Sequence, residues 1–190
     1  KEVFDAAMAY SRSCTGQEGD ALLYGFLSSQ VKTTITSGLI TFDYTVLYHS
    51  DAAQEAALTA EVDKVLSELA LDGKSNYEKV RLIHDYICNH VDYDDTYGNY
   101  SAYSALCEGS AVCQGYAVLF YRMCKDAGLS VRVLSGTGNQ EPHAWNIVQV
   151  GSKYYNIDCT WDDQETRIIY DYFLKNDADF GNHTRDPLYT

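Results

Sequence analysis

A loop of small residues that runs directly into an apolar helical pattern, residues 109–121, constrains this chain more than any other stretch. The loop delivers Cys113 to the start of a predicted helix, and Gly128 is placed to end that helix with a left-handed cap. Apolar residues at helical spacing predict one buried side, made of Ala117, Leu119, Phe120, Met123 and Cys124.

Cys113 therefore lies at or near a helix N-terminus, where unpaired N–H groups and the positive end of the helix dipole favour a thiolate. The thiolate is the nucleophilic form of cysteine. Free cysteine is also among the residue types most often buried, and position alone favours that simpler interpretation of Cys113. A nucleophile needs partners from elsewhere in the chain.

Length and composition predict one globular domain over residues 1–190, because 46% of the residues are hydrophobic and 22% are charged. No apolar run approaches the ~20 residues that cross a bilayer. The chain opens with lysine and without a visible signal peptide, which predicts a processed or truncated piece. A net charge of −13 argues against nucleic acid and anionic membrane surfaces as partners.

Six cysteines are scattered without a C-x-x-C pair, so the spacing of a zinc site is absent and no metal or cofactor is predicted. The even count leaves disulfides open. The 17 tyrosines suit half-buried strands, or a cleft wall that presents flat rings to a polymer.

The rest of the chain alternates helical and strand patterns, which predicts an α+β fold. Residues 18–27 are the better helical stretch of the first 30, and residues 40–48 alternate as a strand. Ser50-Asp51 caps a helix that ends near Asp72-Gly73, and a capping box at Ser75 opens a helix through residue 91.

Residues 92–103 form a loop rich in Asp, Tyr, Gly and Asn. Its acidic residues, Asp92, Asp94 and Asp95, do not complete a calcium loop, so a solvated turn is predicted. Its four tyrosines line a cleft beside Cys113 or pack the loop down: Tyr93, Tyr97, Tyr100 and Tyr103. In the helix before it, His84 is expected to be a core-edge histidine, since no second chemical group accompanies it.

A β-hairpin strengthens the interpretation of Cys113. Residues 130–134 are predicted to form a strand and 135–142 a loop, followed by strands 143–150 and 153–158. With Gly151-Ser152 as a two-residue turn, Trp145 faces Asp158, and His143 and Asp158 become diagonal neighbours on one face. A three-residue turn would place them on opposite faces.

A histidine oriented by a carboxylate is what a thiol nucleophile needs, because the imidazole takes the thiol proton and the carboxylate stabilises the imidazolium. A backbone N–H at the start of the Cys113 helix is placed to stabilise an oxyanion. The sequence does not identify a second donor; Gln114, next to the cysteine, is one candidate.

Three segments together resemble the core motifs of the transglutaminase-like superfamily, a branch of the papain-like cysteine enzymes: Cys113-Gln114-Gly115-Tyr116-Ala117, His143-Ala144-Trp145-Asn146 and Asp158-Cys159-Thr160-Trp161-Asp162-Asp163. Residues 79–86 and 170–174 resemble the flanks of its bacterial members. The resemblance implies a catalytic core at 75–183, a variable leading region at 1–74, and a triad of Cys113, His143 and Asp158. It also implies further residues that support the site or its cleft: Gln114, Gly115, Tyr116, Trp145, Asn146, Trp161, Asp162 and Tyr103.

The same resemblance implies a cysteine protease that hydrolyses proteins or peptides, including cell-wall peptides, in a secreted or cell-envelope setting. A transglutaminase that passes the acyl group to an amine is the first alternative. A non-catalytic module that binds a peptide or glycan in the tyrosine-lined cleft is the second. The sequence leaves open the substrate, the choice between water and amine, and the oligomeric state.

Overall fold

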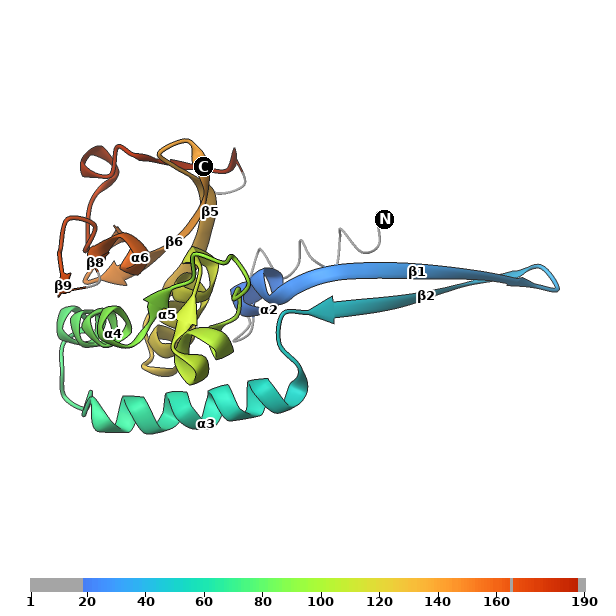
Figure 1. Ribbon diagram of the computed structural model, residues 1–190, viewed down its shortest axis with the longest axis horizontal. Helices are drawn as coiled ribbons and strands as arrows, with labels where there is room; N and C mark the ends of the chain where they lie inside the picture. Colours follow the sequence, from blue (N-terminus) through green and yellow to red (C-terminus); the bar gives the residue numbers. More distant parts are fainter. Residues whose placement is uncertain (1–18, 165, 188–190) are drawn as a thin grey trace.

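The computed structural model of the chain describes residues 19–164 and 166–187, and its fold is α+β (Figure 1). The helices are α2 (Gly19–Gly25), α3 (Ala52–Glu68), α4 (Asn76–His90), α5 (Cys113–Asp126) and α6 (Cys159–Asp162), with single turns η1 (Ser104–Glu108) and η2 (Asp177–Asp179). The longer strands are β1 (Phe26–Thr36), β2 (Leu39–Tyr48), β5 (Val131–Gly138), β6 (Glu141–Val150) and β7 (Lys153–Ile157). The short strands are β3 (Asp92–Tyr93), β4 (Ser110–Ala111), β8 (Asp163–Gln164), β9 (Arg167–Ile168) and β10 (His183–Arg185).

Helix α5 is the centre of the molecule. It packs against α2, α3, α4 and the sheet strands β5 and β6. The predicted buried residues of α5 are buried. All the residues from Gly115 to Phe120 are buried as well, so the helix is enclosed on more than the one side that was predicted. Gly128 has the predicted positive φ of 79°, and the amides of Gly128 and Leu129 bond back to Lys125 and Cys124 as in a Schellman cap.

A four-stranded antiparallel sheet in the order β10-β5-β6-β7 carries the predicted hairpin. Val150 pairs with Lys153 and Asn146 with Ile157, which confirms the two-residue turn and its register. The predicted loop at 135–142 is wrong. β5 continues to Gly138, Asn139 and Gln140 make a turn with φ of 49° and 74°, and β6 starts at Glu141.

Helices α3 and α4 begin at the predicted caps. Asp51 and Ser75 each complete a capping box, with Gln54 and Glu78 respectively. Both helices bury apolar residues against α5 and its neighbours, among them Leu58 and Val62 of α3 and Ile83 and Ile87 of α4. Helix α3 ends at Glu68, earlier than predicted, because Ala70 already adopts a left-handed conformation with φ of 49°.

Strands β1 and β2 form a hairpin that projects as a long arm from the body of the molecule (Figure 1). Part of the predicted helix at 18–27 is therefore wrong, since α2 ends at Gly25 and β1 starts at Phe26; the helical patterns before residue 19 lie outside the described residues. The predicted strand 40–48 is confirmed as β2. One face of the arm holds exposed apolar side chains: Val31, Ile35, Ile40, Phe42 and Tyr44.

The loop before α5 is held beside the helix start by strand pairing. β3 pairs in parallel with β4, and Val112 donates its N–H to the carbonyl of Asn99 at 2.8 Å. These bonds bring Tyr93 and the loop after it next to Cys113.

Candidate active site

Cys113 is the first residue of α5, as predicted, and Val112 is the N-cap. Gly115 and Tyr116 already donate to the carbonyl of Val112, at 2.9 and 3.3 Å. The N–H groups of Cys113 and Gln114 come before these bonds, so they are the ones placed to bind negative charge. Cys113 is half-buried and lines a cavity of about 1030 Å³ that also includes His143. Four tyrosines contribute to this cleft: Tyr24, Tyr93, Tyr97 and Tyr100.

His143 reaches the cleft from β6, and its ring is held on two sides. The ring of Trp161 stacks on it with centroids 5.0 Å apart. On another side Gly138 leaves the space that the ring needs, since a Cβ there would lie 3.0 Å from His143 Cδ2. Burial alone would lower the pKa of His143, but its hydrogen bonds with Asp158 and Cys113 outweigh burial and raise the pKa to about 10. The ring is therefore suited to hold a proton beside the thiol.

Asp158 lies one residue beyond strand β7, where it is the N-cap of α6. The prediction that it continues the strand is wrong, yet the predicted contact forms: His143 Nε2 donates to Asp158 Oδ2 at 2.7 Å. The amides of Thr160 and Trp161 donate to Oδ1 at 3.0 and 3.3 Å. Burial opposes the charge, but the hydrogen bonds from His143 and His183 dominate and the pKa of Asp158 is lowered. The carboxylate is fully buried, ionised and fixed in orientation.

Because Nε2 of His143 is bound to Asp158, Nδ1 is the ring atom left to exchange a proton with Cys113. The side-chain interaction between Cys113 and His143 completes a chain of three groups from thiol to carboxylate. Such a chain can generate a thiolate, protonate a leaving amine and later deprotonate water.

His183 is a second histidine on the same carboxylate, which sequence reasoning missed. It lies on β10, its side chain is fully buried, and its Nε2 donates to Asp158 Oδ2 at 3.0 Å. Residues 175–187 show no periodic pattern, so nothing in the sequence pointed to this contact.

The other predicted site residues divide between the cleft and the layer beneath it. Gln114 and Trp161 line the cleft. The Gln114 amide donates to the carbonyl of Tyr24 at 2.7 Å, so it ties α2 to the start of α5. Asn146 donates to the carbonyl of Ala117 at 2.9 Å, which fixes α5 on the sheet.

Five further predicted residues support the site from below. Gly115 lets the backbone of Ser101 approach, and the Tyr116 hydroxyl donates to the carbonyl of Val91 at 2.6 Å. The remaining three are buried or half-buried away from the cleft: Trp145, Asp162 and Tyr103. Tyr103 packs against the core instead of lining the cleft as its three neighbours in the loop do.

The predicted solvated turn is confirmed for Asp92 and Asp95, which are exposed, but is wrong for Asp94. Asp94 is buried and accepts from the amides of Thr96, Gly98 and Asn99 at 2.8–2.9 Å. These bonds close the loop that holds Tyr93. Burial and the neighbouring Cys113 raise the pKa of Tyr93 to about 12, so its hydroxyl keeps a proton beside the thiol.

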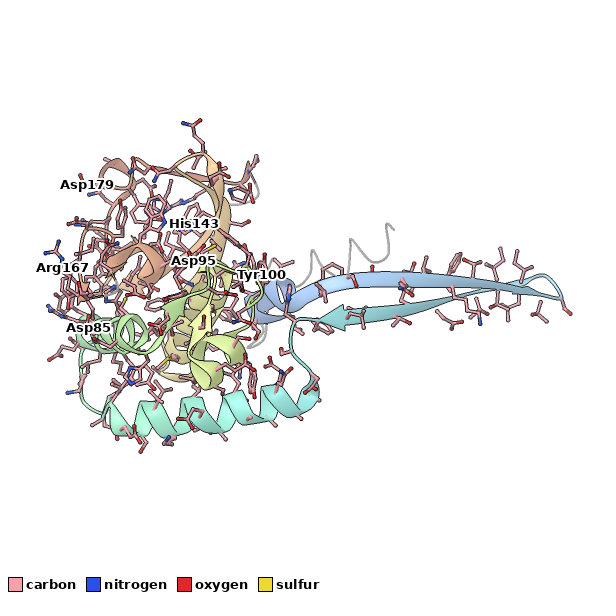
Figure 2. All side chains as sticks on the ribbon, in the orientation of Figure 1. Asp85, Asp95, Tyr100, His143, Arg167 and Asp179 are labelled. Atoms are coloured by element: carbon pink, nitrogen blue, oxygen red, sulfur yellow. The ribbon has the colours of Figure 1, made fainter. Side chains whose placement is uncertain are left out.

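A smaller cavity of about 700 Å³ adjoins the ring of His143. His143 and Trp161 belong to both cavities, and Asp92, Asp95 and Asp163 line the second one. Figure 2 shows His143 close to Asp95, where the loop after β3 faces β6. This side of the cleft carries negative charge.

A second histidine–aspartate pair lies in the core. His84 is fully buried, and its Nε2 contacts Asp162 Oδ2 at 3.1 Å while Nδ1 contacts Asp85 Oδ1 at 2.9 Å. Burial acts against the charged ring, but these carboxylates raise the pKa of His84 to about 11. His84 is a core residue, as expected, but the premise that no second chemical group accompanies it is wrong.

Two groups among residues 19–164 and 166–187 have side chains close enough to hold a metal ion: His84 with Cys88 and Cys159, and His143 with Asp158 and His183. In both groups the donor atoms already bond to one another, for example Cys88 Sγ to His84 Nε2 at 3.6 Å. The five described cysteines are free thiols, and Cys14 lies outside the described residues. Within the described ranges, every helix is too short or too polar to cross a bilayer.

Comparison with known proteins gives one consistent family. The model of the transglutaminase-like superfamily matches residues 63–159, a range that includes all three triad candidates. A crystal structure described as a TGase has the same fold with a TM-score of 0.53 at 19% identity, over 76% of this chain and 48% of that one.

Two curated relatives carry the name kyphoscoliosis peptidase. The protein from Homo sapiens is 28% identical over 160 residues, which are 75% of this chain and 23% of the human protein. The protein from Mus musculus is 28% identical over 128 residues, 58% of this chain and 19% of its own. The chain thus spans about a quarter or less of the length of these relatives.

Proposed function

The chain belongs to the transglutaminase-like superfamily, and on that premise we propose that it breaks amide bonds of peptides or proteins by thiol acyl transfer. Hydrolysis is the leading form, and the peptidase name of the two relatives supports it. The observation that carries the proposal is Cys113 at the start of α5, beside a His143 ring whose far nitrogen bonds to buried Asp158 at 2.7 Å. A secreted or cell-envelope setting stays a prediction.

In the proposed reaction, His143 takes the proton of Cys113 and the thiolate attacks the amide carbonyl carbon. The imidazolium then gives that proton to the leaving amine as the C–N bond breaks, which leaves a thioester on Cys113. His143 next takes a proton from water, and the resulting hydroxide attacks the thioester. The C–S bond breaks to release a carboxylic acid, and the proton on His143 returns to the sulfur of Cys113. Asp158 keeps its charge throughout and orients the ring.

The oxyanion of each tetrahedral intermediate needs two hydrogen-bond donors. The backbone N–H groups at the start of α5 supply one, because they precede the first helical hydrogen bond. We assign the second to Tyr93, which lines the cleft and whose hydroxyl stays protonated at neutral pH. Gln114 is less suited, since its amide is already bound to Tyr24.

Transamidation is the second candidate, supported by the acidic wall beside His143. A lysine amine is cationic, so Asp92, Asp95 and Asp163 would concentrate it near the thioester. Incubation with a peptide library, with and without a lysine-like amine, separates the two by mass spectrometry. New termini indicate hydrolysis, and a mass increase of amine minus ammonia indicates transamidation.

Thiol reactivity tests the proposal without a known substrate. Cys107 is a free thiol on an exposed residue. Partial burial of its sulfur raises its pKa, so Cys107 serves as a control thiol that the reagent can reach but that is not activated. We expect iodoacetamide at pH 6 to label Cys113 at least ~10-fold faster than Cys107, because only a thiolate reacts well. Cys113→Ala should abolish turnover while Cys107→Ala leaves it intact. Equal labelling of the two thiols would support the binding-module alternative instead.

A further inference from the structure

We infer that His183 is a positioning residue of the triad, which holds Asp158 in the orientation that His143 requires; the inference rests on the function proposed above. Two histidines donate to one carboxylate oxygen: His143 at 2.7 Å and His183 at 3.0 Å, both to Oδ2 of Asp158. The backbone of α6 holds Oδ1, so His183 supplies the second fixed contact on the oxygen that faces the catalytic ring.

The fold delivers His183 to this place by adding β10 to the edge of the sheet. His183 pairs with Gly138 and Thr184 with Thr137, both on β5. His143 lies across β5 from this pairing, on β6, where it pairs with Gly136. Gly136 allows this approach, because a Cβ there would collide with the backbone of Thr184. Chain segments 25 residues apart thus meet at one carboxylate.

The surroundings of His183 favour a fixed ring over a mobile one. It stacks on Phe180 with centroids 3.9 Å apart and packs against Trp161 at 4.3 Å and Trp145 at 4.9 Å. Its Nδ1 is buried without a hydrogen-bond partner. The tautomer with hydrogen on Nε2 suits both facts, since it gives Asp158 a donor and leaves only a lone pair unpaired on Nδ1.

A purely packing role would need only an aromatic ring at this position. Trp161 links the two possibilities, because it contacts both His183 and the catalytic His143. The test must therefore separate the hydrogen bond that His183 donates from the space that its ring fills. One substitution has to keep the aromatic ring and lose the donor, and another has to keep the donor and lose the ring.

The test compares His183→Phe, which fills the aromatic site without a donor, with His183→Gln, whose amide N–H has about the reach of Nε2. Loss of a hydrogen bond that orients a metal-binding side chain lowers activity by ~10–100-fold, and we take the same range for the carboxylate that orients His143. We expect that loss for His183→Phe in kcat and in the rate of Cys113 labelling by iodoacetamide, with KM unchanged. His183→Gln should stay within about threefold of the wild type.

Melting temperatures measured alongside identify any loss that comes from unfolding. If His183→Phe does not fold, His183→Asn replaces it, because its shorter amide does not reach Oδ2. Equal rates for donor-free and wild-type proteins, or equal losses for Phe and Gln, would overturn the inference. A wild-type Cys113 that labels no faster than Cys107 would instead overturn the proposed function, so the two failures are distinguishable.

Discussion

Gly138→Ala is the sharpest perturbation that the candidate site offers, since it adds one methyl group against the ring of His143. The new Cβ would lie 2.8 Å from Trp161 Cζ2, and 3.0 and 3.1 Å from Cδ2 and Cγ of His143. Carbon atoms pack at ~3.5–4.0 Å, so the two rings must retreat by roughly 0.5–1 Å. Neither ring is the loose end of a flexible side chain.

A displacement of ~1 Å in a catalytic group costs on the order of 10²-fold in rate, or about 2.7 kcal/mol of transition-state stabilisation. In the Gly138→Ala protein we therefore expect iodoacetamide to label Cys113 ~10²-fold more slowly than in the wild type. Substrate turnover should be slower by the same factor. Overpacking also costs about 1–3 kcal/mol of folding free energy, which lowers the Tm of a chain of this size by roughly 2–12 °C. Rates measured at 20 °C should avoid that effect.

The matched control is Gly181→Ala, the same methyl addition at a glycine with no atom within 4 Å of the new Cβ. It should leave both rates and the Tm unchanged. Suppose that a folded Gly138→Ala protein showed rates of Cys113 labelling and of substrate turnover within threefold of this control. The ring of His143 would then not need its present position. The geometric basis of the triad would then be refuted.

Three further predictions concern the same framework. The raised pKa of His143 contributes stability in full below pH ~6.5, and that contribution is lost as pH rises through 10; the urea midpoint should fall over this range, and less in His143→Gln. Tyr93→Phe should lower kcat by ~10-fold or more with labelling of Cys113 unchanged, because an oxyanion donor acts only on substrate. Asp20 is fully buried and accepts two hydrogen bonds from Arg132, at 2.7 and 2.9 Å. Asp20→Ala should therefore lower the free energy of unfolding by about 3 kcal/mol. Glu61→Ala, which breaks an exposed pair, should stay within ~0.5 kcal/mol in the same urea titration.

The sequence predicted those parts of the fold whose cause is local. The capping box at Ser75, the left-handed Gly128 and the two-residue turn at Gly151-Ser152 each depend on a few neighbouring residues. The hairpin register then brought His143 and Asp158 together without any knowledge of the rest of the sheet.

Errors arose where tertiary contacts decide the structure. Gly136 and Gly138 suggested a loop at 135–142, yet they are strand residues that make room for β10 and for the ring of His143. Strand β1 was not predicted, because it is exposed along its length and no buried face requires apolar and polar residues to alternate. The turn at Ser37-Gly38, with φ of 51° and 85°, was its one local signal.

Asp158 and Asp162 show that residue type alone does not separate a candidate catalytic pair from a structural one. They lie four residues apart on one helical turn, and each bonds to a histidine: Asp158 to His143, and Asp162 to His84. Both histidines have strongly raised pKa values, so neither burial nor charge separates a catalytic pair from a structural one. The difference is access, because His143 opens onto the cleft beside Cys113 whereas His84 is fully enclosed. A histidine–aspartate pair becomes a candidate for catalysis only where the fold gives it a nucleophile and room for substrate.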